Sequence, residues 1–236
     1  MEKMWDSEAD NYADGYTAEQ RTEIISAVKE QLPPDDVQAI HFADILLQNI
    51  ELGKYIDDSG ELNAQRDRMM AENTLWILQQ EQARGNSRIM ISGHNNHIMQ
   101  CENAGTPVLG SLLAENLGDG YFAIGTDFYK SVCNLPNPYT GKRITHTFYS
   151  YDPLAKASKK CGFDVSFLDF SKVPEGSLLT EHLANSISMG SLGESYSVLM
   201  NFVPRSYRVQ RIPQDAYDAM IFAANATPIE IESLNK

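Results

Sequence analysis

Cysteine is scarce in this chain, and its few cysteines form no recognisable pattern. The 236 residues contain three, Cys101, Cys133 and Cys161, which are widely spaced and form no CxxC pair. A disulfide framework or a structural zinc site needs paired or clustered thiols. The sequence therefore favours a reducing compartment, and we expect a cytoplasmic protein.

Positive charge and long apolar runs are also lacking. The chain has 19 basic residues against 32 acidic ones, which gives a formal net charge of −13. A nucleic-acid partner needs a basic face, and an anionic membrane surface attracts basic segments. No apolar run approaches the roughly 18 residues that indicate a transmembrane helix. We therefore expect no nucleic-acid partner and no membrane, and the sequence does not indicate an oligomeric state.

Several familiar catalytic motifs are missing as well. No serine lies in a GxSxG elbow, no glycine-rich loop follows a strand, and there is no HExxH zinc motif. These absences argue against the α/β-hydrolase, nucleotide-binding and zincin types of site. What is present is ordinary globular composition, with 42% hydrophobic and 22% charged residues.

Residues 1–85 are predicted to form a helical segment. Thr17-Ala18-Glu19-Gln20 has the capping-box pattern, which predicts a helix from there to about Leu32. Pro33-Pro34 ends it, and a second helix follows. A third helix is predicted over residues 63–84, and Gly85 ends that one.

Residues 86–236 are predicted to form an α/β domain. Short apolar runs alternate with longer polar segments, and that order favours a mostly parallel sheet. A short helix fits residues 106–117, and a loop or hairpin tip fits residues 134–143. Strands are expected at residues 88–93, 121–128, 165–170, 198–202 and 219–223.

The segment that follows the first predicted strand carries the most chemistry. His94 and His97 have HxxH spacing and enclose Asn95 and Asn96. In open α/β sheets, ligands bind in the loops past the carboxyl ends of the strands. The two imidazoles could bind a metal, although zinc catalysis usually needs a third protein ligand. They could also perform metal-free acid–base chemistry, with the amides donating to an oxyanion. A polar loop that caps a helix is the third interpretation.

The third predicted helix carries polar residues on an apolar stripe. Arg66, Met70, Asn73 and Ile77 share one face, because residues three or four apart are neighbours on a helix. The polar members either lie at the edge of the stripe and meet water or line a polar cleft. Periodicity does not decide between these two possibilities.

Four segments resemble, in order and spacing, those of the erythromycin esterase family, which includes succinoglycan biosynthesis protein-like members. His94-Asn95-Asn96-His97-Ile98 resembles the family's HNxHI segment. The other matches are Arg66–Asn73 to the RDxxMAEN helix, Gly110–Leu113 with Tyr121–Phe128 to the next segment, and Tyr217–Phe222 to the closing strand.

The resemblance implies a three-layer α/β/α fold and metal-independent ester hydrolysis without a cofactor. In the best-known members the substrate is the lactone of a macrolide antibiotic, so the expected partner is a macrolide-like small-molecule ester. Catalytic roles are implied for His94 and His97. Residues expected to contact the substrate or to orient its neighbours are Arg66, Asp67, Glu72, Asn73, Asn95 and Asn96.

The sequence departs from the family pattern at its N-terminal side. The family's GE…H segment, whose histidine activates water, is missing, and His41 has no Gly-Glu before it. We therefore expect this chain to be the C-terminal part of one larger catalytic domain, with exposed apolar surface. Two alternatives stay open. One is a non-catalytic module that binds haem through His94 or His97, and the other is a metal-dependent hydrolase using the same pair.

Overall fold

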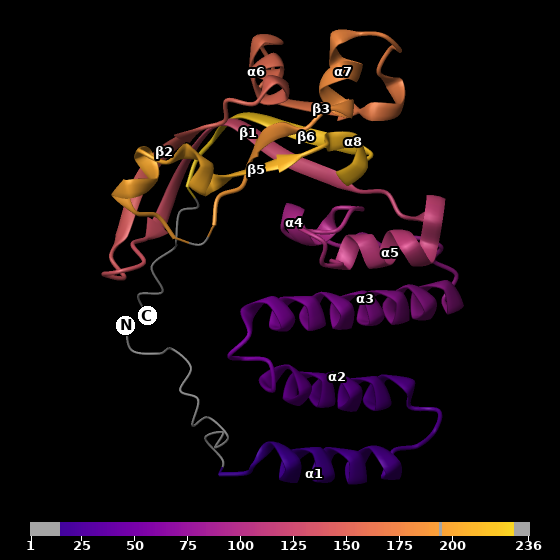
Figure 1. The fold of residues 1–236 in the computed structure, drawn as a ribbon. Helices are drawn as coiled ribbons and strands as arrows, with labels where there is room; N and C mark the ends of the chain where they lie inside the picture. Colours follow the sequence, from indigo (N-terminus) through magenta and orange to yellow (C-terminus); the bar gives the residue numbers. More distant parts are fainter. Residues whose placement is uncertain (1–14, 194, 229–236) are drawn as a thin grey trace, which may run out of the picture. The chain divides into compact units, whose positions relative to one another are not determined.

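The computed structural model describes residues 15–193 and 195–228 of the chain. These residues form two compact units, which divide between Ile89 and Met90. The first unit consists of helices, and the second combines strands with shorter helices (Figure 1). Within the described ranges, no helix is both long and apolar enough to cross a membrane.

The capping box predicted at the start of the first helix is confirmed. Helix α1 spans Ala18–Gln31, with Thr17 as its N-cap. The backbone N–H of Gln20 donates to the Thr17 hydroxyl at 3.3 Å, and the Thr17 N–H donates to the Gln20 carbonyl oxygen of the side chain at 2.9 Å. The pair satisfies two N–H groups that a helix start leaves without partners.

The next two helices are also confirmed, with one shifted boundary. Helix α2 spans Val37–Gly53 and helix α3 spans Ser59–Ala83. Helix α3 therefore begins before the predicted residue 63. The cause is Asp58, whose carboxylate accepts hydrogen bonds from the next turn and acts as the N-cap.

Helix α2 packs between α1 and α3. An ion pair between Lys29 and Asp44 joins α1 to α2, and the His41 ring stacks on the Trp76 ring of α3 at 3.8 Å between centroids. Large apolar side chains on these helices remain exposed, among them Phe42 at 63%. The expected exposed apolar surface is thus present in this unit.

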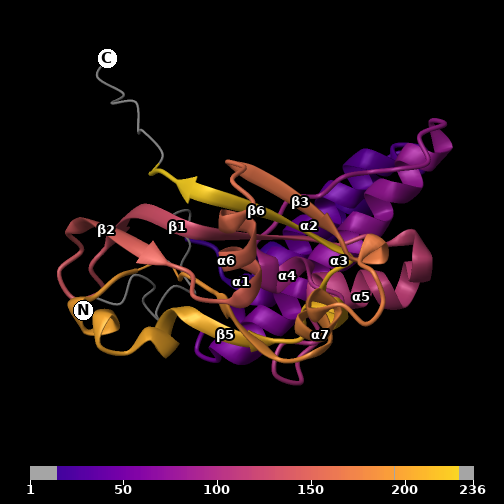
Figure 2. The same cartoon turned by 90° about the horizontal axis from the view of Figure 1, so that it is seen from above.

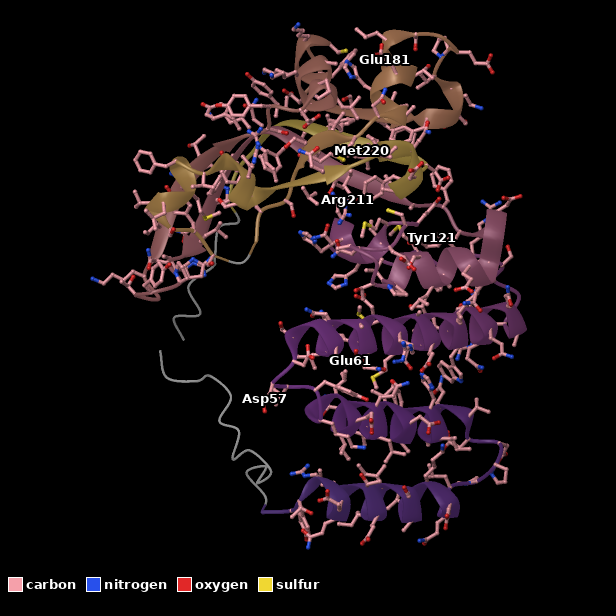
Figure 3. All side chains as sticks on the ribbon, viewed as in Figure 1. Asp57, Glu61, Tyr121, Glu181, Arg211 and Met220 are labelled. Atoms are coloured by element: carbon pink, nitrogen blue, oxygen red, sulfur yellow. The ribbon has the colours of Figure 1, made fainter. Side chains whose placement is uncertain are left out.

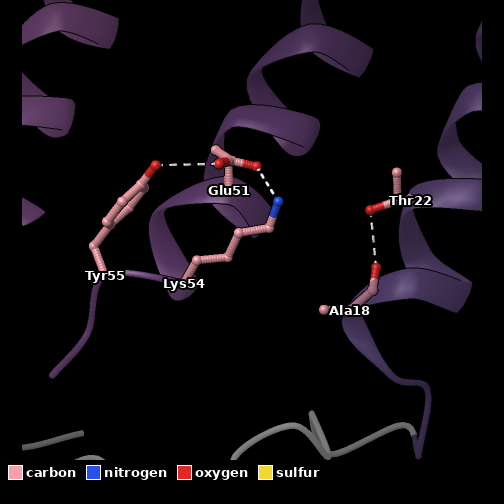
Figure 4. Close-up of polar contacts among 5 residues, drawn as sticks. All are labelled: Ala18, Thr22, Glu51, Lys54 and Tyr55. Carbon is pink, nitrogen blue, oxygen red and sulfur yellow. Dashed lines mark hydrogen bonds and ion pairs between the residues drawn. The ribbon is translucent and has the colours of Figure 1, made fainter.

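Local polar contacts fix the ends of these helices. The Glu51 carboxylate accepts hydrogen bonds from Lys54 Nζ at 2.6 Å and from the Tyr55 hydroxyl at 3.4 Å (Figure 4). In α1, the Thr22 hydroxyl donates to the backbone carbonyl of Ala18 at 2.9 Å (Figure 4). All of these contacts join residues within one turn of the chain and are at least partly solvent-exposed, so they contribute little to stability.

The second unit is built on a four-stranded sheet with the order β2-β1-β6-β3. These strands span Ile124–Pro136 (β1), Arg143–Tyr149 (β2), Val165–Asp169 (β3) and Ala219–Ala226 (β6). Strands β1 and β6 are parallel, whereas β2 and β3 pair antiparallel with their neighbours.

The prediction of a mostly parallel sheet is therefore wrong. The hairpin tip predicted near residues 134–143 is confirmed. It explains part of the error, because a short hairpin connection returns the chain along β1 as the antiparallel strand β2. The three-layer α/β/α arrangement is not confirmed, because a second, two-stranded sheet packs against β1. It consists of β4, Ile187–Gly190, and β5, Arg208–Arg211. Neither strand was predicted.

Two predicted strands are wrong. Residues 86–94, which include the expected strand at 88–93, have no regular secondary structure. Residues 198–202 mostly form the 3-10 helix η3, Val198–Asn201, because the backbone satisfies its hydrogen bonds locally, from Met200 N to Ser197 O at 2.9 Å. The strands predicted at 165–170 and 219–223 are confirmed as β3 and β6. The strand predicted at 121–128 is confirmed as β1 with shifted bounds, because it begins at Ile124 and continues to Pro136.

Short helices surround the main sheet. Helix α6 packs on β1 and β6, and it lies with α7 over one face of the sheet, as the two views show (Figures 1 and 2). The helix predicted at 106–117 is confirmed as α5. The remaining bounds are Asn95–Ile98 (α4), Leu109–Leu117 (α5), Pro153–Lys160 (α6), Leu178–Ala184 (α7) and Pro213–Ala216 (α8). Other 3-10 helices are Gly118–Gly120 (η1), Phe170–Lys172 (η2) and Pro204–Tyr207 (η4).

The core of this unit lies between the sheet and its helices. Met99 and Met220 are fully buried, and Tyr217 and Phe222 join them in one apolar cluster. Burying large apolar side chains in this way stabilises a fold by about 1.5–3 kcal/mol each. This cluster holds in place the strands and loops that line the candidate active site.

Candidate active site

The two predicted catalytic histidines lie on one helical turn. His94 is the N-cap of α4, and its ring Nδ1 accepts a long hydrogen bond from the Asn96 N–H at 3.4 Å. A neutral imidazole that accepts at Nδ1 carries its proton on Nε2. His94 is exposed, whereas His97 is half-buried in the same turn.

The side chain of Asn95 holds this turn to the sheet. Its amide Nδ2 donates to the backbone carbonyl of Thr126 at 2.6 Å, and its Oδ1 accepts from the Thr126 N–H at 3.1 Å. The Thr126 hydroxyl donates to the same oxygen at 3.2 Å. The turn is therefore positioned by β1, and not by a preceding strand as the sequence suggested.

His94, Asn95 and Asn96 line a pocket of about 420 Å³. Its other walls are Thr126–Phe128 of β1, the end of β4 with the loop after it, β5, Tyr217 and two alanines of β6. A volume of this size is typical of sites for small molecules. Of the two histidines, His94 lines the pocket and His97 does not.

Arg211, at the end of β5 (Figure 3), brings a positive charge to this pocket. Its Nη2 donates to the side-chain oxygens of Asn103, at 2.6 Å, and Asn96, at 3.5 Å. Its Nε is buried without a hydrogen-bond partner. Among the described residues no carboxylate forms an ion pair with it, so the guanidinium is available to an anion or to a carbonyl oxygen.

Asp127 is the second group that sequence reasoning missed. It lines the pocket from β1 although its exposed fraction is only 7%. Burial and the nearby Asp152 carboxylate raise the pKa of Asp127 to about 7, because both disfavour its charged form. Hydrogen bonds from the N–H groups of Phe128, at 2.7 Å, and Gly190, at 3.5 Å, oppose that rise.

No local sequence signal marks Arg211 or Asp127. Asp127 falls within a segment that matches the family pattern, but its burial depends on Gly190 and Asp152, which are distant in sequence. Arg211 belongs to a strand that the apolar pattern did not reveal. A cluster of charged groups formed by long-range packing cannot be found from spacing within one segment.

The four predicted residues on the RDxxMAEN helix belong to the helical unit. Asp67 is buried in α3, whereas Arg66 and Glu72 are exposed. Asn73 Nδ2 donates to Gln48 Oε1 at 2.9 Å, and Gln48 Nε2 donates to Glu72 at 3.4 Å. Contacts of these four side chains with a substrate remain predictions.

A thiol nucleophile and a metal site are two other chemical possibilities for this chain. Cys101 is a free thiol, and burial raises its pKa, so the thiol form is favoured over the nucleophilic thiolate. Across residues 15–193 and 195–228, no three His, Cys, Asp or Glu side chains gather as a metal-binding group.

Comparison with known proteins places this geometry in context. The sequence model of the erythromycin esterase family matches residues 5–226. A crystal structure of a Bacillus cereus protein matches with a TM-score of 0.73 and 19% identity, over 92% of this chain and 52% of that chain. A crystal structure of a succinoglycan biosynthesis protein matches with a TM-score of 0.71 and 14% identity, over 96% and 58%.

The chain spans about half the length of these two solved structures. No curated protein sequence matches it. At these low identities the two structures establish a shared fold and nothing more.

Proposed function

The chain belongs to the erythromycin esterase family, and on that premise we propose that it forms part of an ester hydrolase. The substrate would be a small-molecule ester of the macrolide type, cleaved by water without a metal or cofactor. Family membership confirms the resemblance read from the sequence motifs, while the reaction itself is our proposal.

One observation carries this proposal. His94 lines the same small-molecule-sized pocket as Arg211, whose guanidinium has no carboxylate partner in the described part of the chain. Ester hydrolysis develops negative charge on the carbonyl oxygen, and preorganised donors stabilise that charge. A cation and a proton-bearing imidazole in one pocket supply such donors.

The roles follow from the hydrogen bonds of each group. With Nδ1 accepting from Asn96, the His94 ring presents an N–H at Nε2, which can donate a hydrogen bond to the carbonyl oxygen as negative charge develops on it. Arg211 can stabilise the oxyanion through the N–H groups that Asn103 and Asn96 leave unused. The Asn95 amide, held by Thr126, is best described as fixing the position of His94.

The test is hydrolysis of erythromycin and of 4-nitrophenyl butyrate by the full-length protein. We expect His94→Ala to lower kcat/KM at least 10²-fold, the usual scale for losing a general acid–base group. His182→Ala, in helix α7 outside the pocket, is the matched control and should keep wild-type turnover. Wild-type turnover in His94→Ala would contradict the proposal.

A further inference from the structure

We propose that the pocket beside His94 binds an organic monocarboxylate with an apolar tail, held through the Arg211 guanidinium, and therefore takes the acyl half of the ester. In the reaction proposed above such an acid is the product, so this inference rests in part on the proposed function. Binding of the acid can nevertheless be measured without any turnover.

Arg211 keeps hydrogen-bond donors that the protein does not use. Its Nη2 donates to Asn103 at 2.6 Å and to Asn96 at 3.5 Å, while its Nη1 donates to no residue in the described part of the chain. Its Nε–H is buried without an acceptor, and such a donor costs free energy. Because a guanidinium can bind a carboxylate through two parallel hydrogen bonds, the unused donors favour an oxygen-bearing anion as the ligand.

The two opposite charges of the pocket are not paired with each other. Among the described residues that line it, Arg211 is the one Arg or Lys and Asp127 is the one Asp or Glu. The Asp127 oxygens accept instead from the N–H groups of Phe128, at 2.7 Å, and Gly190, at 3.5 Å. The guanidinium charge therefore remains for a ligand. A single cation beside Asp127 suits a monoanion better than a dianion such as phosphate, which the carboxylate would repel more strongly.

The two-stranded sheet places apolar side chains next to this charge. Val209 and Arg211 are two residues apart on β5, so their side chains point to the same face of the strand. Met189 of β4 pairs with Val209, and both line the pocket. A ligand whose carboxylate contacts Arg211 can thus lay a hydrocarbon tail over Val209 and Met189.

This apolar wall is well supported by the core. Met189 and Tyr217 are almost fully buried, and Val209 packs against the same core cluster. An acyl chain that covers such a wall is removed from water, which is favourable in proportion to its apolar area. A carboxylate with a tail of several carbons should therefore bind more tightly than acetate.

Ester hydrolysis would convert a neutral ligand into an anion in this pocket. Water adds its oxygen to the acyl carbon, the alcohol leaves, and the new acid gives its proton to solvent at neutral pH. The resulting carboxylate carries a full negative charge that the ester lacks, so it should bind Arg211 more tightly than the substrate does. In a lactone the carboxylate and the new hydroxyl remain in one ring-opened molecule. We therefore expect competitive inhibition by the product acid.

The binding test is isothermal titration calorimetry of the full-length protein with sodium hexanoate at pH 7. Hexan-1-ol, which has the same number of carbons and no charge, is the matched ligand. Hexanoate should bind at least 10-fold more tightly than hexan-1-ol and at least 10-fold more tightly than sodium acetate. Inorganic phosphate should not compete with hexanoate.

Three variants assign the charge to one residue. Arg211→Met should weaken hexanoate binding at least 10-fold and leave hexan-1-ol binding unchanged, because the apolar wall stays in place. Arg211→Lys should keep part of the preference for hexanoate. Arg205→Met, which removes an exposed arginine of η4 outside the pocket, is the matched control and should bind hexanoate as the wild type does.

The possible results separate this inference from the proposed function. Equal wild-type affinities for hexanoate and hexan-1-ol, or unchanged hexanoate binding in Arg211→Met, would overturn the inference even if the protein cleaves esters. Phosphate that competes as well as hexanoate would also overturn it, because the site would then accept anions in general. A protein that binds hexanoate through Arg211 but hydrolyses no ester would overturn the proposed function and support the carboxylate site.

Discussion

The Asn95 side chain forms a two-way clasp on the backbone of Thr126, donating to its carbonyl at 2.6 Å and accepting from its N–H at 3.1 Å. The clasp fixes the turn that carries His94 against β1. An amide that satisfies both backbone groups of a strand residue is expected to contribute to stability as well as to site geometry.

Asn95→Ala should therefore lower the free energy of unfolding by about 2 kcal/mol, since at least two hydrogen bonds are lost and backbone groups are left unpaired. Urea unfolding followed by circular dichroism measures this change. Asn116→Ala is the matched control, because the exposed Asn116 side chain bonds only within its own helix. Equal stability of the two variants would show that the clasp contributes nothing.

Helix α5 passes close to the end of the His94 turn at Gly110. A Cβ there would lie 2.4 Å from the backbone of Ile98 and of Met99. Gly110→Ala should lower the free energy of unfolding by about 3 kcal/mol, because backbone must move to relieve the overlap. Gly120→Ala, whose new Cβ would make only an ordinary 3.6 Å contact, should change it by less than about 0.5 kcal/mol in the same urea titration.

The stability of the protein should depend on the ionisation of Asp127. Its folded-state pKa is raised to about 7 from an ordinary 3.8, so the folded state binds more protons than the unfolded state between these values. The stability contribution is fully present below pH 4 and is lost as pH rises through 7. Asp127→Asn should remove this dependence and raise stability at pH 8 by about 2 kcal/mol. Thermal unfolding at several pH values measures it, and parallel curves for wild type and variant would contradict it.

Gly190→Ala tests the positioning of the same carboxylate without removing it. The new methyl group would overlap Asp127 Oδ1 at 2.9 Å, so the carboxylate must move from its place in the pocket. We expect kcat/KM to fall about 10-fold, because a carboxylate displaced into the pocket would disturb how the substrate is positioned there. Gly193→Ala, which would meet no atom within 4 Å, is the control. An unchanged kcat/KM in Gly190→Ala would show that this placement is unimportant.

Arg211→Met should distinguish the effect of the positive charge from the effect of side-chain packing on activity. Methionine keeps an unbranched apolar chain but cannot stabilise an oxyanion, so kcat should fall about 10²–10³-fold. Stability should change by less than about 1 kcal/mol, since no carboxylate among the described residues loses a partner. Arg211→Lys should recover part of the rate. Full activity in Arg211→Met would show that the guanidinium does not stabilise the oxyanion.

Helix starts and ends are predicted best from the sequence, because they depend on residues that are close neighbours in the chain. The Thr17 capping box and the Pro33-Pro34 stop are local signals, and α1 and α2 follow them. The His94 turn also forms as a helical segment. Where an element depends on a distant partner, prediction fails: residues 88–93 are apolar enough for a strand, but no strand pairs with them in the described structure.

The residues of the candidate site show the same contrast between local sequence signals and long-range packing. His94 could be identified from the sequence because a second histidine and two amides follow it within three residues. Asp127 becomes chemically unusual only when Gly190 and Asp152 close around it, and Arg211 only when Asn96 and Asn103 accept its hydrogen bonds. Such burial and pairing result from tertiary packing, which a single sequence does not display.

The parallel pairing of β1 with β6 determines when the pocket forms during folding. Ile124 pairs with Ala219 and Asp127 with Phe222, so two of the pocket's walls meet only after a loop of about 95 residues has closed. Contacts that far apart in sequence form late and slowly compared with helices and hairpins. The capped helices and the β1–β2 hairpin can form while the pocket does not yet exist. Recovery of ester hydrolysis during refolding should therefore lag behind recovery of the helical circular dichroism signal.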